Sequence, residues 1–491
     1  MKKPRLLLCL ILSAGILAGC NSNSAGQQPA DKKEQSSSGA KTTGETDNEK
    51  ETETDSQRGQ YEKQAAKLKK LYKENPDDAD NALKYAQTLF TLGSFDDAEE
   101  ILNPLLNEDN PSPDAIYVSA QIQYLNGKYT TAEELYTKLV KDHYDEYGRD
   151  AEAGLQMIYY QTNQFSKAND LFAGQDDLEN PLLDLMKGFE DATPYEIDWN
   201  GREQTSIPFT AGEPLPVVPI EVNGVKMNAI IDTGAASLVI DETRAKEWGI
   251  ESISKDEGKF AGGNTADIAY GKAESMKLGD VNLQNIPVML GPFEGFSEGF
   301  SDIAGGVHAI IGTNLLQQFI PIMDYPSGRL VLLPRDEAGY RQLSDMQEKE
   351  NTAGEIPFTL AYTHYMIAKG SINGYNDLNM FIDSGLAFEE AGIILGDDAM
   401  KILSIPVNDL KQADDGGGMG GNDFQEKTFS LASYGLGNLT LKDGVGYYFT
   451  GGAVNLFEDT GYISDALISH NYLKQYKWTI NFDSMTMSFI N

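Results

Sequence analysis

The feature that most constrains the fold is an internal duplication in the second half of the chain. Each copy holds, in the same order, an IPFT segment, an Asn-Gly turn, an apolar run that ends in Asp-(Thr/Ser)-Gly, and a Leu-Gly turn. The paired positions are Ile207 and Ile356, Asn223 and Asn373, Asp232 and Asp383, and Gly279 and Gly437. Short apolar runs separated by Gly and Asn are typical of all-β structure. We therefore expect two β lobes, at residues 205–340 and 350–491.

The duplication places one carboxylate in each copy, 151 residues apart. Asp232 follows the run NAII, and Asp383 follows the run NMFI. Two carboxyl groups within hydrogen-bond distance cannot both ionise readily, so they share one proton. Such a pair can activate a water molecule with its ionised member and polarise a carbonyl with its protonated member. The alternative for each loop is a strand-ending turn, where Asp, Ser and Gly are common.

This arrangement resembles the aspartic proteases, and within them the retropepsin-like group, here with two copies on one chain as in the two-lobed pepsins. The resemblance covers residues 205–491 and implies hydrolysis of internal peptide bonds, with Asp232 and Asp383 as the catalytic pair. It implies that the hydroxyls after each Asp cross-link the two loops, and that the glycines let the backbone turn tightly beside the carboxylates. These supporting residues are Thr233, Gly234, Ser384 and Gly385.

The family also needs a flap, a glycine-bearing hairpin that closes over the substrate. Glycine-rich stretches at 258–271 and 414–424 lie in the corresponding interval of each copy. The flap candidates are Gly262, Gly263, Gly420 and Gly421. A flexible loop is the other reading of both stretches, and glycine content does not distinguish the two.

The second copy departs from the family pattern at two positions. Leu386 stands where the first copy has Ala235, and Ser469 stands where the first copy has Gly312. Two alternatives to an endopeptidase with an internal dyad therefore remain open. One is a catalytically inactive peptide-binding or scaffold module. The other is a protease that is active only as a homodimer, through two Asp232 loops.

Residues 61–190 are expected to form a separate helical domain. The segment YAQTLFTLGSFDDAEEIL begins at Tyr85 and SAQIQYLNGKYTTAEELY begins at Ser119, 34 residues later. A related third unit follows at a spacing of 36 residues. A small residue, a Gly and an aromatic at the turn, and then Ala, at this period, resemble the tetratricopeptide repeat. The resemblance implies a solenoid that holds a protein partner or the substrate; a packing spacer or a plain helical bundle is the alternative.

The first 60 residues are expected to lie outside the folded domains. A basic MKKPR is followed by an apolar run too short to span a membrane and by LAGC, which resembles a bacterial lipobox. Residues 1–19 are thus expected to be a signal peptide, and Cys20 the site of lipidation. Residues 20–60 are polar and are expected to be a disordered tether. This predicts a lipid-anchored protein of the cell envelope, on the outer side of the cytoplasmic membrane or in the outer membrane; the alternative is an ordinary secreted protein.

Composition excludes several function classes. Acidic residues outnumber basic ones by 75 to 39, which argues against nucleic acid as a partner and leaves the lipid as the only expected membrane contact. Removal of Cys9 with the signal peptide leaves Cys20 alone, so no intrachain disulfide is expected. The four histidines are widely spaced and form no HExxH motif, so we expect no metal. The aspartic-protease resemblance implies a polypeptide substrate and no cofactor. The predicted class is a multidomain α+β chain: a tetratricopeptide-like solenoid, then an all-β, two-lobed aspartic-protease-like fold.

Overall fold

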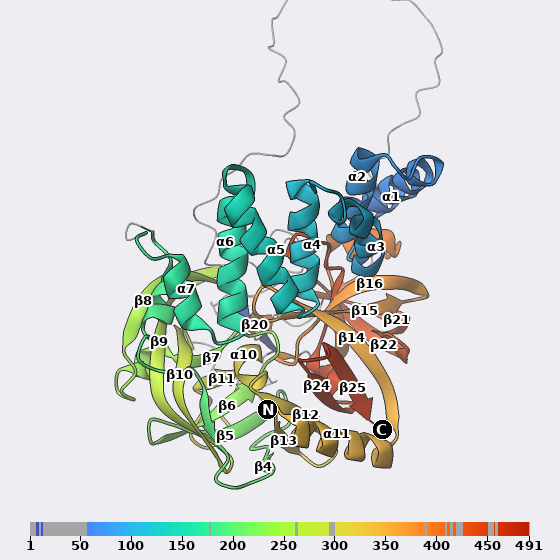
Figure 1. Ribbon diagram of the computed structural model, residues 1–491. Helices are drawn as coiled ribbons and strands as arrows, with labels where there is room; N and C mark the ends of the chain where they lie inside the picture. Colours follow the sequence, from blue (N-terminus) through green and yellow to red (C-terminus); the bar gives the residue numbers. More distant parts are fainter. Residues whose placement is uncertain are drawn as a thin grey trace, which may run out of the picture.

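A computed structural model of the 491-residue chain shows a helical domain placed on two β-barrels (Figure 1). The structure describes residues 6–8, 11–12, 56–175, 178–260, 264–293, 300–387, 390–407, 410–412, 416–418, 426–449, 456 and 460–490. The predicted fold class, a helical repeat region followed by two β lobes, is confirmed. Within the described residues, no helix has both the length and the apolar character needed to cross a membrane.

The helical domain is built from antiparallel pairs of helices. Its helices are α1 (Gln57–Glu74), α2 (Ala79–Thr91), α3 (Phe95–Leu106), α4 (Pro113–Leu125), α5 (Tyr129–Asp142), α6 (Tyr144–Gln161), α7 (Phe165–Leu171) and α8 (Pro181–Lys187). The repeated alanines Ala98, Ala132 and Ala168 have no exposed surface, because they lie where the two helices of a pair approach closely. Gly93 and Gly127 end the first helix of their pairs in the left-handed region, with φ of 72° and 69°.

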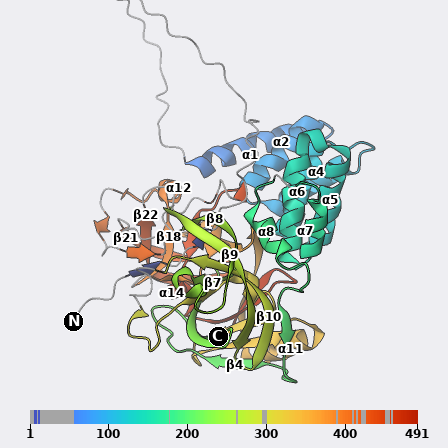
Figure 2. The ribbon, with the colours of Figure 1, turned by 90° about the vertical axis from the view of Figure 1, so that its left-hand side faces the viewer.

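The helical domain docks on the β region through three equivalent turns of its repeats, at Gly93, Gly127 and Asn163. We call these three turns the turn edge. Figures 1 and 2 show the helices gathered on one side of the barrels, across both lobes. A Cβ on Gly93 would lie 2.5 Å from an Asn379 side chain, and one on Gly127 would lie 2.9 Å from a Met485 side chain. In the third turn, Asn163 Nδ2 donates to Gln318 Oε1 at 2.9 Å. The turn edge thus contacts the second lobe through its first two turns and the first lobe through its third.

Each lobe is a closed six-stranded barrel. The first closes in the order β9 (Asn264–Leu278), β5 (Val217–Val222), β6 (Val225–Ile231), β11 (Ala309–Ile311), β7 (Leu238–Asp241) and β10 (Val281–Gly291). The second closes in the order β21 (Glu426–Leu436), β22 (Leu439–Phe449), β18 (Ala391–Leu395), β23 (Ala466–Ile468), β16 (Tyr375–Ile382) and β15 (Tyr365–Ile372). Pairing of β9 with β10 and of β21 with β15 completes the two rings. The Asn-Gly turns predicted at 223–224 and 373–374 join β5 to β6 and β15 to β16.

A six-stranded sheet shared by the lobes lies beneath the barrels. Its order is β14 (Thr352–Ala361), β25 (Thr486–Ile490), β24 (Lys477–Asn481), β12 (Phe319–Asp324), β13 (Arg329–Pro334) and β4 (Thr205–Pro208). The lobes meet where β12 pairs antiparallel with β24, with Ile322 opposite Thr479. Helix α11 (Glu337–Glu350) joins the lobes and packs Leu343 against the sheet. The lobes are therefore fixed to each other by backbone hydrogen bonds as well as by the turn edge.

The remaining elements are short or peripheral. The helices are α9 (Glu242–Ala245), α10 (Thr313–Leu316), α12 (Asp397–Ile402) and α14 (His470–Leu473). The strands are β1 (Leu6–Leu8), β2 (Ile11–Leu12), β3 (Glu196–Asp198), β8 (Ser252–Phe260), β17 (Leu386–Ala387), β19 (Lys411–Gln412) and β20 (Gly416–Gly418).

The start of α1 is fixed to the second lobe by a buried ion pair. Arg58 donates from Nε and Nη2 to the two oxygens of Asp465, at 2.6 and 2.5 Å. Both side chains are buried, with exposed fractions of 4% and 2%. The backbone N–H groups of Gln57 and Arg58 donate to the Asp398 carboxylate of α12, which satisfies two free donors of the helix N-terminus.

Arg58→Met is expected to lower the free energy of unfolding by about 3–5 kcal/mol, because it leaves the Asp465 carboxylate buried without its cation. Urea unfolding followed by circular dichroism measures this change. Arg341→Met is the matched control, since the pair that Arg341 forms with Glu337 is exposed and such pairs contribute about 0–1 kcal/mol. Equal effects of the two substitutions would contradict the proposed importance of the buried pair.

Candidate active site

The two Asp loops occupy equivalent positions in the two barrels. Asp232 follows β6 and Asp383 follows β16, and each of these strands runs parallel to the short central strand beside it. The backbone N–H of Asp232 donates to Ile311 O at 3.0 Å, and that of Asp383 donates to Ile468 O at 2.9 Å. The duplicated sequence therefore produces duplicated backbone geometry at both aspartates.

The hydroxyls that follow the aspartates cross-link the two loops. The Thr233 N–H donates to Ser384 Oγ, and the Ser384 N–H donates to Thr233 Oγ1, both at 3.0 Å. Each hydroxyl in turn donates to the opposite strand: Thr233 Oγ1 to Ile382 O at 2.8 Å and Ser384 Oγ to Ile231 O at 3.0 Å. Both residues are fully buried, so these bonds join the lobes in an environment without competing water.

The glycine of each loop lies against the carboxylate of the other loop. A Cβ on Gly234 would lie 2.6 Å from Asp383 Cγ, and a Cβ on Gly385 would lie 2.1 Å from Asp232 Cγ. The two glycine N–H groups donate to the Asp of their own loop, at 2.7 Å for Gly234 and 2.9 Å for Gly385. Only a residue without a side chain fits at either position, and the two carboxylates consequently lie together between the loops.

The environment of the pair favours the protonated form of Asp383. Burial, then the negative charge of Asp232 and a side-chain hydrogen bond with Asp232, raises the pKa of Asp383 well above its usual range. The Gly385 N–H opposes this shift. A raised pKa next to a second carboxylate is the pattern of two acids that share one proton, so the pair is one titrating unit.

The departure at Ser469 is accommodated within the second lobe. In the first lobe a Cβ on Gly312 would lie 2.5 Å from Ser237 O and 2.6 Å from Ala235 O. In the second lobe Ser469 has a Cβ at the equivalent position, and its Oγ donates to Ala391 O at 2.7 Å. The same hydroxyl accepts from the Asn471 N–H at 3.2 Å. The serine is thus fully buried and hydrogen-bonded, and the Asp383 loop keeps its bonds to the first lobe.

Extended backbone lies beside the second Asp loop. β17, which begins at the buried Leu386, pairs antiparallel with β1, and β1 also pairs in parallel with β20. β2 pairs with β8 at Phe260 and Lys259. β1 and β2 both lie within residues 1–19, the predicted signal peptide. Together they pair with the strand that follows Asp383 and with strands from both glycine-rich stretches. An extended peptide that adds to the edge of a sheet in this way is bound through main-chain hydrogen bonds.

The flap candidates Gly262, Gly263, Gly420 and Gly421 lie outside the described residues, as does Cys20. On the described side of the first stretch, β8 and β9 pair as far as Phe260 and Asn264. Among the residues that the structure describes, no group of three His, Cys, Asp or Glu side chains is placed to hold a metal ion.

Sequence reasoning missed a contact between the helical domain and the first Asp loop. Asn314 Nδ2 donates to Tyr160 Oη at 3.2 Å, and the Asn314 N–H donates to Ala236 O at 2.7 Å. The neighbouring Thr313 Oγ1 donates to Thr233 O at 3.0 Å. The recurrence of Asn two residues after Gly312 and Ser469 could have marked this position, but nothing in the sequence pairs it with α6.

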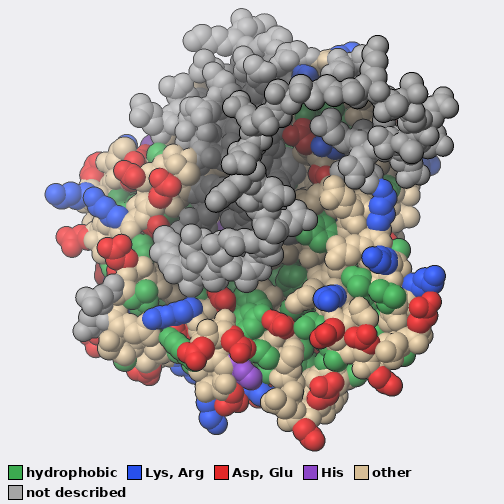
Figure 3. Space-filling view, turned by 90° about the horizontal axis from the view of Figure 1, so that it is seen from above, with side chains coloured by type: hydrophobic (Ala, Val, Ile, Leu, Met, Phe, Trp, Pro, Cys, Tyr) green, Lys and Arg blue, Asp and Glu red, His purple; other side chains and the backbone are tan. Residues whose placement is uncertain are grey.

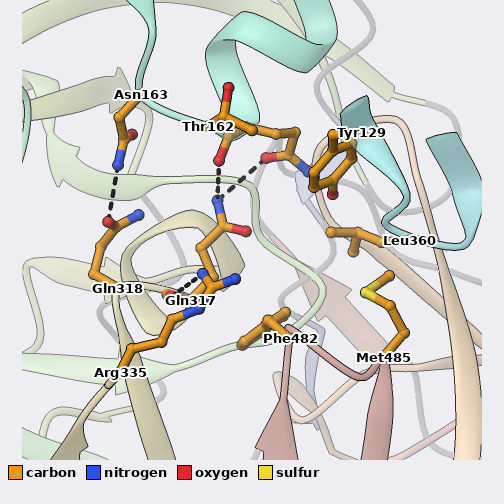
Figure 4. A pocket seen from close by; sticks show the side chains of 10 residues that line it. Tyr129, Thr162, Asn163, Gln317, Gln318, Arg335, Leu360, Phe482 and Met485 are labelled. Carbon is orange, nitrogen blue, oxygen red and sulfur yellow. Dashed lines mark hydrogen bonds between the residues drawn. The ribbon is translucent and has the colours of Figure 1, made fainter. Parts of the chain in front are cut away.

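A second missed contact joins the end of α6 to both lobes. Gln161 Nε2 donates to Thr363 O of the second lobe at 3.1 Å. Gln317 Nε2 of the first lobe donates to Gln161 Oε1 at 3.3 Å and to Gln161 O at 3.4 Å (Figure 4). A cavity of about 260 Å³ lies beside this junction, with Arg335 and Met485 in its wall. The helical domain therefore helps to hold the two lobes in register.

Two parts of the chain match known protein families. Residues 218–315 match the family described as Aspartyl protease, and this match includes the Asp232 loop but not the second lobe. Residues 57–122 match the family described as Tetratricopeptide repeat. The chain therefore carries tetratricopeptide repeats and an aspartic protease domain.

The comparison with solved structures includes the crystal structure of a retropepsin-like aspartic protease from Rickettsia conorii. It is 14% identical to this chain, with a TM-score of 0.21, and the match covers 28% of this chain and 89% of that one. The comparison with curated proteins gives no match.

Proposed function

We propose that this chain is an aspartic endopeptidase that hydrolyses internal peptide bonds with a water activated by Asp232 and Asp383, without a cofactor. The observation that carries the proposal is the mutual placement of the loops, in which each glycine leaves space only for the carboxylate of the other loop. Both carboxylates come from one chain, which favours an internal dyad over a dimeric site.

The reaction follows from the shared proton. The ionised carboxylate of the pair takes a proton from the water, while the protonated carboxyl donates a hydrogen bond to the scissile carbonyl. The water oxygen then bonds to the carbonyl carbon. The C–N bond breaks as the amine leaves with a proton from the pair, which regenerates the starting state. The buried hydroxyl cross-links hold the loops while the two carboxylates exchange roles.

The substrate in this proposal is an extended polypeptide. The pairing of β1, a segment of the predicted signal peptide, with β17 and β20 supports this, since an extended segment there has backbone bonds on both sides next to Asp383. Tetratricopeptide repeats indicate a protein interaction, and we propose that the helical domain recruits the substrate or a partner protein.

Cleavage of a mixture of unfolded proteins by the full-length chain, read by mass spectrometry between pH 3 and pH 8, tests the proposed activity. We expect new internal termini and a bell-shaped pH profile. The rate falls at low pH, when both carboxyls are protonated and no base remains, and it falls at high pH, when the Asp383 proton is lost. Because the pKa of Asp383 is raised, the alkaline limb is expected above the ordinary value of 3.8. Absence of cleavage over this range would contradict the proposal.

We further propose that the chain is exported and anchored to the cell envelope through a lipid on Cys20. The motif Leu17-Ala18-Gly19-Cys20, directly after an apolar run, supports this. Mass spectrometry of the chain from its native host tests the proposal: an acylated peptide that starts at Cys20 is expected, and an unmodified Cys20 within a longer peptide would contradict it.

A further inference from the structure

We propose that the seam between the helical repeats and the second lobe is a docking site for a basic segment of the substrate polypeptide, in which an Arg or Lys lies beside apolar residues. This inference rests on the proposed function, because it assigns the site to the same substrate. The seam is separate from the Asp loops, and it is formed jointly by the two domains.

The seam contains a cavity of about 190 Å³. One wall comes from α4 and α6 and includes Tyr117, Gln121 and Met157, and the other comes from the β14–β15 turn and includes Ala361 and Tyr362. The Tyr124 hydroxyl donates to Tyr362 O and joins the two walls. Pockets for drug-sized ligands are typically about 300–1,000 Å³, so this cavity suits one long side chain and its neighbours.

A glycine lets the Tyr136 ring pack closely against α6 in the helical wall. A Cβ on Gly154 would lie 2.6 Å from the ring of Tyr136, so this position of α6 has no space for a side chain. Tyr117 stacks on Tyr147 with ring centroids 4.7 Å apart and meets the edge of Tyr136 at 6.2 Å. The wall thus contains a group of packed tyrosine rings, and aromatic rings of this kind attract cations.

Asp150 supplies the charge for a cation in this wall. It lines the cavity and lies close enough to Tyr136 and Tyr147 to influence their phenols. Among the described residues, its carboxylate has no ion pair or hydrogen bond, in contrast to Asp114, which accepts from the Tyr147 hydroxyl. A partly buried carboxylate without a counter-charge is costly, and burial accordingly raises the pKa of Asp150. An Arg or Lys between the carboxylate and the rings would form an ion pair with Asp150 and a cation–π contact with the tyrosines.

The overall charge favours a basic partner. The net charge of the chain is −36, and acidic side chains gather along the lower edge of the face shown in Figure 3. A strongly acidic protein increases the encounter rate of a basic polypeptide through long-range attraction.

The seam is connected to the catalytic loop by a row of aromatic rings. Tyr362 stacks with Tyr365 at 6.1 Å, and Tyr365 meets the edge of Phe381 at 5.3 Å. Phe381 lies two residues before Asp383 on β16. A polypeptide docked at the seam is therefore held against the hairpin whose partner strand carries the catalytic Asp.

Binding can be measured without cleavage in a full-length Asp232→Asn chain, by fluorescence anisotropy with two labelled peptides. One contains Leu-Arg-Leu, and the other contains Leu-Gln-Leu in its place. We expect the Arg peptide to bind about tenfold more tightly, as for one charge-assisted contact in an aromatic site. Adding Asp150→Asn is expected to remove this difference. Asp142→Asn, which removes the same charge from an exposed site at the end of α5, is expected to change the affinity less than about twofold.

Equal binding of the two peptides, or an equal loss in Asp150→Asn and Asp142→Asn, would overturn the docking site. Cleavage by the wild-type chain separates this result from the proposed activity. Two substrates share the same cleaved sequence, and only one of them carries the basic segment. The substrate with the basic segment is expected to have the lower KM. Cleavage of both with equal KM, together with no effect of Asp150→Asn on binding, would refute docking and leave the activity standing. Selective binding of the Arg peptide without cleavage of either substrate would refute the activity and support the docking site.

Discussion

Asp232→Asn and Asp383→Asn are each expected to lower kcat for peptide cleavage by about 10²- to 10⁴-fold, the range for loss of a general acid or base. The reason is that Asn neither ionises nor carries the shared proton, so one carboxyl of the pair is lost in either variant. Initial rates on a peptide identified from the protein digest measure the effect. Circular dichroism establishes that each variant is folded.

Asp280→Asn is the matched control for these variants, because Asp280 is exposed in the turn between β9 and β10 of the first lobe. It is expected to leave kcat within about twofold. Retained activity in Asp383→Asn alone would place Asp383 outside the chemistry and favour a dimeric site built from two Asp232 loops.

Gly385→Ala is expected to lower kcat about 100-fold, although it removes no functional group. The added Cβ would lie 2.1 Å from Asp232 Cγ, so the second loop must move away from the first carboxylate. Displacement of catalytic groups by about 1 Å costs rates of this size. Steady-state kinetics measure the change, and kcat is expected to fall more than KM rises.

Gly212→Ala provides the control for Gly385→Ala. A Cβ at Gly212 has its nearest heavy atom at 3.9 Å, an ordinary contact, so activity close to that of the wild-type chain is expected. A Gly385→Ala chain with unchanged kinetics would show that the two carboxylates do not need the close approach of the loops.

Much of the architecture could be predicted because it is local or periodic. The recurrence of IPFT, Asn-Gly and Asp-(Thr/Ser)-Gly indicated two equivalent lobes, since each element is a run of a few residues with a defined turn. The 34-residue spacing that relates Gly93 to Gly127 indicated paired helices in the same way. The hydroxyl and glycine residues of the two loops could be identified because they directly follow Asp232 and Asp383 in the sequence.

The relations between domains could not be predicted from these patterns. The pairing of β12 with β24 and the ion pair of Arg58 with Asp465 join residues more than a hundred positions apart, and no period links them. The same holds for the bond from Asn314 to Tyr160, which depends on how the turn edge lies on the barrels. Ser469 looked like a departure in the sequence, whereas its hydrogen bond to Ala391 O is visible only in three dimensions.

The proposed dyad forms within one chain, from one carboxylate of each lobe. Cleavage by an equimolar mixture of Asp232→Asn and Asp383→Asn chains, beside the wild-type chain at the same total concentration, tests this most directly. Full activity is expected in the wild-type sample and only the residual activity of the two variants in the mixture, because no single chain there has both carboxylates. Activity in the mixture above the sum of the two variants would contradict it, because the two carboxylates would then come from different chains.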